Sequence, residues 1–391
     1  MEFTVSQNLQ GIARSAIEEF FKHSADPAFV PMAMGNPDPD AAPRGLLREL
    51  LEAVAREDVD QALSYSVGPG YTPLRDLLKD HLAAQNCFDS SADELMVVSG
   101  SLQSADLLCR ALCNRGDVII CEQPSFVGCL NTFRSNGATL VGVPTAEDGI
   151  DIPLLEQALA EHRNARFIYL IPNFQNPTGY TMSLEKRVAA YGLAKKYGVP
   201  IFEDDPYGDL RFAGQPVPAI KTLDRDGLVF YARSFSKILS AGMRAAYLTF
   251  PKSLFGPLYL AKQCADIHTG MLAQLLCYRF LTARDLPAHL AEITQVYRRK
   301  CALMRGELEK LPADKIAFSR PEGGLFVWLT LLGGEDGEAF ALRLVREKKV
   351  AVVPGSAFFT DQRANPHFRI TFSALRDAQI VRGVQAIGEA F

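Results

Sequence analysis

Short apolar runs alternate with amphipathic segments over residues 95–250, and this alternation constrains the fold more than any other feature of the chain. The runs are "LMVVSG" (95–100), "DVIICEQP" (117–124), "TLVGVP" (139–144), "FIYLIP" (167–172), "VPIFEDD" (199–205), "LVFYARS" (228–234) and "AAYLTF" (245–250). Helix-like segments such as "LEKRVAAYGLAKKYG" (184–198) lie between most of them. Near-continuous apolar strands separated by helices are typical of a mostly parallel sheet buried on both faces. The sequence therefore predicts an α/β domain around a seven-stranded sheet.

A different pattern begins near residue 285. One long helical segment covers 289–311, and separate strand candidates follow at 323–331, 350–355 and 368–374. These elements predict a second, smaller α+β domain, to which the first forty or so residues also belong. We expect a large domain over 45–285 and a small domain made of 1–44 and 286–391, with the loop "AMGNPDPDAAP" (33–43) crossing between them.

The overall composition is that of a soluble globular protein, with 48% hydrophobic and 22% charged residues. No stretch reaches the roughly 18 apolar residues of a membrane span, and the N-terminus lacks a basic region followed by an apolar one. The net charge of −4 and the absence of a dense Lys/Arg run argue against a nucleic-acid partner. The eight cysteines show neither a CxxC nor a paired spacing with histidine, so we expect reduced thiols, no metal and a cytoplasmic location.

Ligands of open α/β sheets bind at the carboxyl ends of the strands, so the polar residues there are the candidate site. The first strand ends in "SGSLQS" (99–104), where Gly100 allows a tight turn and Ser101 begins a helix whose N–H groups can bind an anion. A turn and helix cap would have the same sequence. In "EQPSF" (122–126), Phe126 can stack on a flat ligand or belong to the core.

The next two strand ends carry amide and acidic groups. "PNFQNPTG" (172–179) predicts a rigid loop from which Asn176 can donate to a ligand oxygen. In "FEDDPYGDLRF" (202–212), three adjacent acids would repel one another if all were buried and ionised, so at least one should meet a cation. Asp204 and Tyr207 are the expected pair, and a solvated acidic loop is the alternative.

Two further segments carry cations. In "RSFSKILSAGMR" (233–244), two serines and Arg244 surround Lys237, a combination that suits a phosphate and lowers the pKa of the lysine amine. A lysine with a lowered pKa is a nucleophile toward carbonyl groups. In "FRITF" (368–372), Arg369 lies in an apolar strand, where it needs a carboxylate from the protein or from a substrate.

In this order the motifs resemble those of the aminotransferase class I/II family, the pyridoxal-phosphate-dependent transferases of fold type I. The likeness extends to the branch of the 2-aminoadipate and kynurenine aminotransferases and the MocR regulators. It rests on "YSVGPGYTPLRDLL" (65–78), "SGSLQS", "EQPSF", "PNFQNPTG", "EDDPY", "SFSKILSAGMR", "PEGGLFVW" (321–328) and "FRITF".

The resemblance implies pyridoxal 5'-phosphate as cofactor and assigns a role to each ring contact. Lys237 would form the internal aldimine and move the proton between the substrate α-carbon and the cofactor. Asp204 would keep the ring nitrogen protonated, and Tyr207 and Asn176 would bind the ring hydroxyl. Phe126 takes the stacking position.

The resemblance also implies a phosphate cup, a substrate clamp and a dimer. The cup would comprise Ser101, the Leu102 N–H, Ser234, Ser236 and Arg244. Arg369, with Asn176, would bind the substrate α-carboxylate, and Gly35 belongs to the loop that closes over it. Tyr65 would reach the neighbouring active site of a homodimer.

The chain departs from the family pattern after the lysine. Ala241 replaces a frequent proline and Ala246 a glycine, and Leu102 stands where glutamine is common. Because Gly242 and Arg244 remain, we expect the phosphate cup to survive.

The predicted function is an α-amino acid:2-oxo acid aminotransferase that works through pyridoxamine phosphate, with donor and acceptor left open. A β-eliminating lyase would use the same lysine, aspartate and cup, so it remains an alternative. The ligand-sensing domain of a regulator is a weaker one, since such proteins carry an N-terminal winged helix for which we expect no room. A nicotinamide oxidoreductase would need a glycine fingerprint that the sequence lacks.

Overall fold

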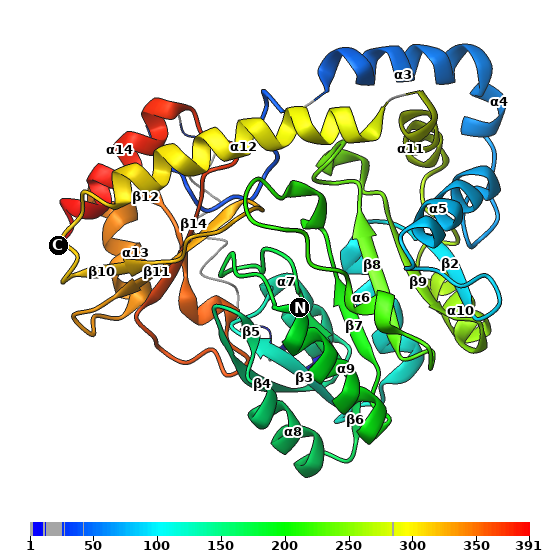
Figure 1. Ribbon diagram of the computed structural model, residues 1–391, viewed down its shortest axis with the longest axis horizontal. Coiled ribbons are helices and arrows are strands. Elements are labelled where there is room, and N and C mark those ends of the chain that lie inside the picture. Colours follow the sequence, from blue (N-terminus) through cyan, green and yellow to red (C-terminus); the bar gives the residue numbers. More distant parts are fainter. Residues whose placement is uncertain (1–2, 11, 13–25, 27, 42, 284) are drawn as a thin grey trace.

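The computed structural model of the 391-residue chain describes residues 3–10, 12, 26, 28–41, 43–283 and 285–391 (Figure 1). Residues 13–25, which belong to the predicted small domain, lie outside the described residues. The main sheet has eight strands in the order β2-β9-β8-β7-β6-β3-β4-β5. Its strands are β2 (Asp93–Val98), β3 (Val118–Gln123), β4 (Thr139–Ala146), β5 (Gly149–Ile150), β6 (Ala165–Leu170), β7 (Ile201–Asp204), β8 (Val229–Ser234) and β9 (Ala246–Pro251).

The seven predicted apolar runs form seven of these strands. β4, β3, β6, β7 and β8 pair in parallel, whereas β9 is antiparallel to both β8 and β2. β5 is an additional two-residue strand that pairs antiparallel with β4, where Gly149 has a φ of +114°. Glycine adopts this φ without a steric penalty, so the chain can turn back at the sheet edge.

Helices cover both faces of the main sheet (Figure 1). Helix α9 shows how the sequence sets their limits: the Ser183 side chain accepts from the Lys186 N–H at its start, and Gly198, with φ +67°, ends it. The helices of this part are α3 (Arg44–Glu57), α4 (Val59–Ala62), α5 (Thr72–Ala84), α6 (Ser101–Leu112), α7 (Val127–Ser135), α8 (Ile152–Glu161), α9 (Leu184–Tyr197), α10 (Phe255–Ala265) and α11 (Met271–Ala283). The short helix α1 (Gln7–Gln10) lies against α7.

A smaller sheet forms the second part of the molecule, and the long helix α12 (Leu286–Leu308) runs across the top of Figure 1 toward it. The strands of the smaller sheet lie in the order β10-β11-β14-β13, and all pairs are antiparallel. β11 and β14 correspond to the runs predicted at 323–331 and 368–374, the run at 350–355 divides into β12 and β13, and β10 was not predicted. A separate two-stranded sheet pairs β1 with β12 in parallel. The bounds are β1 (Val30–Pro31), β10 (Ile316–Phe318), β11 (Phe326–Leu331), α13 (Gly337–Arg343), β12 (Val350–Ala351), β13 (Val353–Pro354), β14 (His367–Thr371) and α14 (Asp377–Gly388).

The eight-stranded and four-stranded sheets are both buried among apolar side chains. Strand β14 of the smaller one lies against the loop that follows β1. The Thr371 N–H donates to the Met32 carbonyl oxygen at 2.9 Å, which fixes this loop beside β14. The carboxyl ends of the parallel strands face the same region, so polar residues from both parts of the molecule converge there. Over the described residues, no helix combines the length and the hydropathy that a bilayer crossing requires.

Candidate active site

A cavity of about 500 Å³ lies at the carboxyl ends of the parallel strands. All the predicted site residues except one line it, and they come from loops and strand ends across the whole chain. They are Gly35, Ser101, Leu102, Phe126, Asn176, Asp204, Tyr207, Ser234, Ser236, Lys237, Arg244 and Arg369.

Lys237 follows strand β8 and is part-buried in this cavity. Its Nζ donates a hydrogen bond to the Gly35 carbonyl oxygen at 2.8 Å and lies 5.9 Å from the centre of the Tyr207 ring. Burial lowers the pKa of Lys237 to about 8, and the charges of Arg369 and Arg244 act in the same direction. A substantial fraction of the amine is therefore neutral near physiological pH, as a nucleophile requires.

Asp204, the last residue of β7, is buried in the floor of the cavity. Its Oδ2 accepts a hydrogen bond from the Tyr169 hydroxyl at 3.0 Å, whereas its buried Oδ1 has no partner among the described residues. Burial raises the pKa of Asp204 to about 7; the Tyr169 hydrogen bond opposes this rise and the charge of Asp205 adds to it. The unpaired oxygen is available to a cationic ligand group, which would favour the ionised carboxylate.

The N-terminus of α6 and Arg244 form one end of the cavity. Arg244 Nη1 donates to Ser236 Oγ at 3.3 Å, and the Ser236 N–H donates to Ser234 Oγ at 3.1 Å. A Cβ on Gly100, which has φ +86°, would clash with the guanidinium of Arg244. Glycine therefore lets Arg244 approach the free N–H groups of α6, which together make an anion site. The arrangement forms with Ala241 in the usual place of proline.

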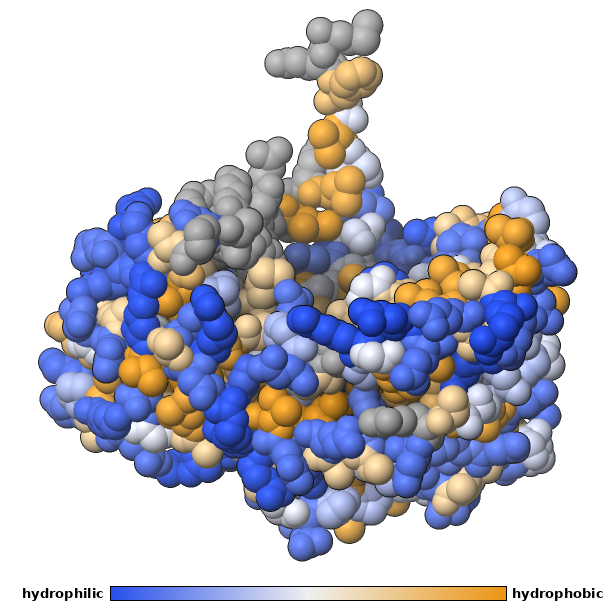
Figure 2. All heavy atoms as spheres, turned by 90° about the horizontal axis from the view of Figure 1, so that it is seen from above, coloured by the Kyte–Doolittle hydropathy of each residue, from blue (hydrophilic) through white to orange (hydrophobic). Residues whose placement is uncertain are grey.

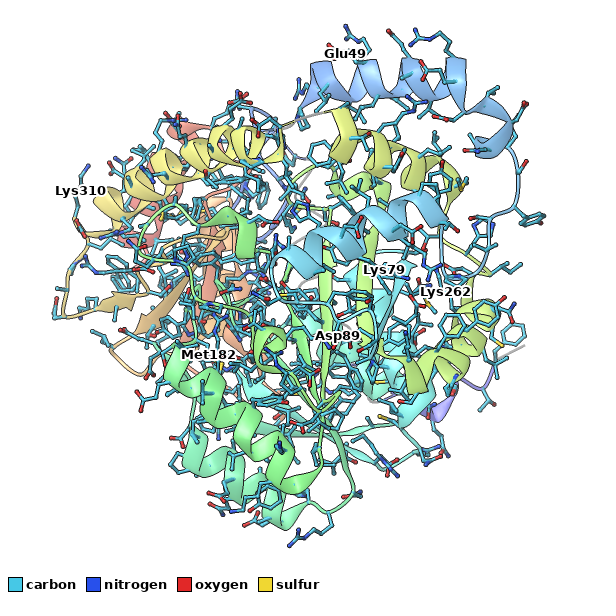
Figure 3. The ribbon with its side chains drawn as sticks, turned by 45° about the vertical axis from the view of Figure 1, so that its right-hand side comes forward. Glu49, Lys79, Asp89, Met182, Lys262 and Lys310 are labelled. Atoms are coloured by element: carbon cyan, nitrogen blue, oxygen red, sulfur yellow. The ribbon has the colours of Figure 1, made fainter. Side chains whose placement is uncertain are left out.

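Lys262 on α10, which is labelled in Figure 3, binds the first turn of α6. Its Nζ donates to Gln103 Oε1 at 2.8 Å, to Asp266 Oδ1 at 2.7 Å and to Thr269 Oγ1 at 3.0 Å. Gln103 in turn donates to Asp266 Oδ2 at 2.9 Å. Because Lys262 is fully buried and has three partners, it fixes the helix end that contributes to the anion site.

Arg369 lies on β14, is buried and lines the same cavity. Its Nη1 donates to Asn176 Oδ1 at 2.7 Å and its Nη2 to the Ala33 carbonyl oxygen at 2.6 Å. The guanidinium carbon lies 4.1 Å from the centre of the Phe326 ring. In the described part of the chain, Arg369 has no carboxylate partner, and its buried Nε has no acceptor. Burial lowers the pKa of Arg369 to about 10, so the residue remains a cation that lacks an anion.

Phe126 and Tyr207 supply aromatic surface to the cavity. Phe126 precedes α7, and its ring lies where a Cβ on Gly128 would be. Tyr207 packs edge-to-face on Phe326, with the ring centres 5.8 Å apart. Burial raises the pKa of the Tyr207 hydroxyl, which therefore stays protonated and able to donate.

Tyr65 is the predicted site residue that does not line the cavity. Its side chain is 87% exposed and packs edge-to-face on His268, with ring centres 5.8 Å apart. The Ser66 N–H donates to His268 Nε2 at 3.2 Å, so this histidine fixes the segment that presents Tyr65 to the outside.

The order of the motifs and the geometry of the cavity agree with a comparison against known families. The family model for aminotransferase class I and II matches residues 28–387. The chain belongs to this family. Aromatic-amino-acid aminotransferase 1 from Thermococcus litoralis is 33% identical over 98% of the chain and 93% of its own length, and 2-aminoadipate transaminase from Thermus thermophilus is 33% identical over 97% and 94%.

The structure of kynurenine aminotransferase from Pyrococcus horikoshii, solved in complex with PMP, covers 99% of this aminotransferase and 96% of its own chain. The TM-score is 0.94 at 30% identity. The predicted fold, fold type I of the pyridoxal-phosphate-dependent transferases, is thereby confirmed, and so is the family resemblance. The protein is an aminotransferase whose family depends on pyridoxal 5'-phosphate.

The cavity of this aminotransferase fits that cofactor. Asp204 Oδ1 is a buried acceptor without a partner, which suits a protonated ring nitrogen. The absence of a side chain at Gly100 lets the Arg244 guanidinium lie against the start of α6, where the cation and the helix N–H groups suit a phosphate. Within the described part of the protein, Asp204 Oδ1 has no hydrogen-bond partner, and Arg244 donates only to the neutral acceptors Ser236 Oγ and the Ala241 carbonyl oxygen.

Sequence reasoning missed some of the cavity wall and the support behind it. Met34, Ile171, Pro206 and Phe326 line the cavity without having been assigned a role. Tyr169 stands behind Asp204, and its signal was a tyrosine in an otherwise apolar run, since a buried hydroxyl needs a partner.

Proposed function

We propose that the protein transfers an amino group between an α-amino acid and a 2-oxo acid in two half-reactions at one site, with Lys237 as the catalytic residue. The observation that carries the proposal is Arg369, a buried cation that lines the same cavity as Lys237 and has no carboxylate partner in the described residues. A bidentate guanidinium fits the α-carboxylate that amino acids and 2-oxo acids share. Both substrates would thus be held by one group.

Bound pyridoxal 5'-phosphate supplies an electron sink for charge that develops at the substrate α-carbon. Asp204 holds a proton on the ring nitrogen, and Tyr207 and Asn176 donate to the ring hydroxyl. Because Arg369 occupies Asn176 Oδ1, the amide NH₂ of Asn176 is the group that donates. Phe126 stacks on the ring, and the phosphate is held by Ser101, the Leu102 N–H, Ser234, Ser236 and Arg244.

Lys237 has two tasks in this proposal. Its neutral amine would hold the cofactor, and when free of it the amine would accept a proton from the substrate α-carbon and release it again. Its lowered pKa of about 8 suits both tasks, because the amine can accept a proton and release it again near neutral pH. The hydrogen bond to the Gly35 carbonyl oxygen fixes Nζ in the cavity, where the charges of Arg369 and Arg244 both act on it.

We also propose a homodimer in which Tyr65 completes the partner's phosphate site. Apolar side chains are exposed along α3, α4 and the segment after them, namely Leu51, Val59, Leu63 and Val67 together with Tyr65. Figure 2 looks down on the molecule from the side of α3 and shows hydrophobic surface among hydrophilic residues. Neighbouring exposed apolar residues favour a protein contact over water.

Two broader assignments belong to the same proposal. The large domain would span 45–285, and the small domain would comprise 1–44 and 286–391. We propose a cytoplasmic location, which is supported by eight cysteines that are all free thiols.

The proposal is tested by mixing the cofactor-loaded enzyme with single amino acids in the absence of a 2-oxo acid. An aminotransferase converts its cofactor to pyridoxamine phosphate and releases one equivalent of the matching 2-oxo acid. Release of ammonia with pyruvate, in repeated turnovers, would instead identify a β-eliminating lyase. Borohydride reduction followed by peptide mapping should locate the cofactor on Lys237, and Lys237→Ala should lose about 100-fold or more in rate. Near wild-type turnover by Lys237→Ala would refute the proposed role.

A further inference from the structure

The carboxylate of Asp204 is held from behind by a residue of the neighbouring strand. The Tyr169 hydroxyl on β6 donates to Asp204 Oδ2 at 3.0 Å, and Cys129 Sγ on α7 lies 4.0 Å from the same oxygen. All three side chains are buried. The other oxygen, Oδ1, is left without a partner and belongs to a residue that lines the cavity.

We propose that Tyr169 is a positioning residue, whose hydroxyl keeps Asp204 ionised and leaves Oδ1 as the oxygen that binds the cofactor ring nitrogen. The inference rests on the proposed function, because it takes Asp204 as the partner of that nitrogen. Tyr169 itself touches neither cofactor nor substrate in this proposal and acts only through the carboxylate.

The surroundings of Asp204 make this hydrogen bond decisive for its charge. Burial favours the neutral acid and raises the pKa of Asp204 to about 7, and the Asp205 carboxylate raises it further, whereas the Tyr169 hydrogen bond lowers it. Cys129 and Tyr207, the other titratable groups beside Asp204, are both neutral, since burial raises the pKa of each. Tyr169 also stays protonated, because burial and the adjacent acids raise its pKa well above the usual value. It therefore acts as the strongest donor to the carboxylate.

The hydroxyl of Tyr169 is not needed to fill space. Its ring packs on Phe133 and Phe202, with centres 5.2 Å and 5.4 Å away, as the ring of a phenylalanine could. The hydroxyl adds the contact with Asp204. A change to phenylalanine thus removes one hydrogen bond and preserves the packing.

The neighbouring strand offers a matched control. Tyr231 on β8 is also buried, and its hydroxyl donates to Asp205 Oδ2 at 3.1 Å. Asp205 does not line the cavity and accepts a second hydrogen bond from the Gly208 N–H at 2.9 Å. Tyr231→Phe therefore removes the same kind of bond, one residue along the chain, from a carboxylate with no proposed role in cofactor binding.

The experiment measures the affinity of the full-length apo-proteins for two cofactor probes by calorimetric titration. The probes are pyridoxamine 5'-phosphate, which binds without a covalent link, and its 1-deaza analogue, in which carbon replaces the ring nitrogen. Tyr169→Phe should weaken binding of the natural probe about tenfold or more and leave binding of the analogue unchanged. Tyr231→Phe should leave both affinities at the wild-type value.

A second measurement follows the Asp204 carboxylate directly in the apo-proteins, by infrared difference spectra against Asp204→Asn. In Tyr169→Phe, the protonation midpoint should move to higher pH than in the wild type. An equal loss of affinity for both probes, or an unchanged midpoint, would overturn the inference, since the hydroxyl would then only shape the pocket. If the wild type bound both probes equally well, the proposed contact of Asp204 with the ring nitrogen would itself be wrong.

Discussion

Asp204, the last residue of β7, and Asp205, which follows it, are adjacent buried carboxylates with opposite surroundings. Asp205 accepts hydrogen bonds from Tyr231 and from the Gly208 N–H, and Arg233 lies 4.0 Å away. Asp204, whose side chain points to the cavity, has one oxygen with no partner in the described residues. These two carboxylates are neighbours in sequence and are equally buried, but within the described residues only Asp205 has a hydrogen-bond partner for each of its oxygens.

Two buried arginines repeat this contrast. Arg187 donates to Asn173 Oδ1 and to several backbone carbonyl oxygens, so its guanidinium is satisfied within the protein. Arg369, at the cavity, has two neutral acceptors and an unpaired Nε. Since a buried charge without a counter-charge costs free energy, the protein tolerates it where a ligand completes the site. The difference teaches that unpaired hydrogen-bonding groups, more than burial, distinguish functional charges from structural ones.

Replacing Asp204 and Asp205 by asparagine, one at a time, tests the contrast most strongly. Asp204→Asn should lower turnover by about 100-fold or more, because the ring nitrogen loses the charge that keeps it protonated. Its melting temperature should not fall, since an unsatisfied buried carboxylate is removed. Asp205→Asn should do the reverse, with a lower melting temperature and near wild-type turnover of the folded fraction. Equal activity losses in both variants would break the comparison.

Much of this contrast could not be predicted from the sequence. The run "VPIFEDD" predicts a strand and three acids at its end, and the alternation of side chains places Asp204 and Asp205 on opposite faces. Which of the two has an unpaired oxygen depends on β6 and β8, whose register brings Tyr169 and Tyr231 to them. Such contacts join residues from separate strands, and no local pattern encodes them.

The fold was more accessible than these contacts. Seven apolar runs predicted seven strands because most of these strands are buried on both faces and therefore consist almost entirely of apolar residues; β4, near the sheet edge, is only partly buried. β5 was missed because two residues are too short for a pattern. The approach of Arg244 to Gly100 could not be predicted either, since it depends on the antiparallel pairing of β2 with β9, which brings the residues after Val98 beside those before Ala246.

Removal of the Arg369 cation should separate substrate binding from stability. Arg369→Leu should raise the KM for amino acids about 100-fold, since the α-carboxylate loses its partner. Cofactor affinity and melting temperature should hold or improve, because an uncompensated buried charge is lost. In contrast, Arg187→Leu should lower the melting temperature, because several buried carbonyl oxygens would lose their hydrogen-bond donor. Steady-state kinetics and thermal unfolding check both variants, and an unchanged KM in Arg369→Leu would contradict the assignment.

Two glycines with nearly the same positive φ test whether this end of the cavity is built for the phosphate. Gly100 and Gly116 have φ of +86° and +87°, but only a Cβ at Gly100 would meet Arg244, whereas Gly116 has open space. Alanine strains both positions by about 1 kcal/mol. Gly100→Ala should in addition weaken cofactor affinity about tenfold, because Arg244 must move. If Gly116→Ala weakened cofactor binding as much, the loss would reflect strain and not the phosphate site.

The smallest expected effect concerns the pH at which Lys237 becomes reactive. Its pKa of about 8 lies below the ordinary lysine value because of burial first and then the charges of Arg369 and Arg244. Covalent uptake of the cofactor by the apo-protein should therefore accelerate as pH rises from 6 to 9, with its midpoint near pH 8, since only the neutral amine attacks. In Arg369→Leu the midpoint should shift to higher pH, because one repelling cation is gone. Stopped-flow absorbance follows the uptake, and a midpoint that stays fixed in this variant would show that the unpaired arginine does not act on the lysine.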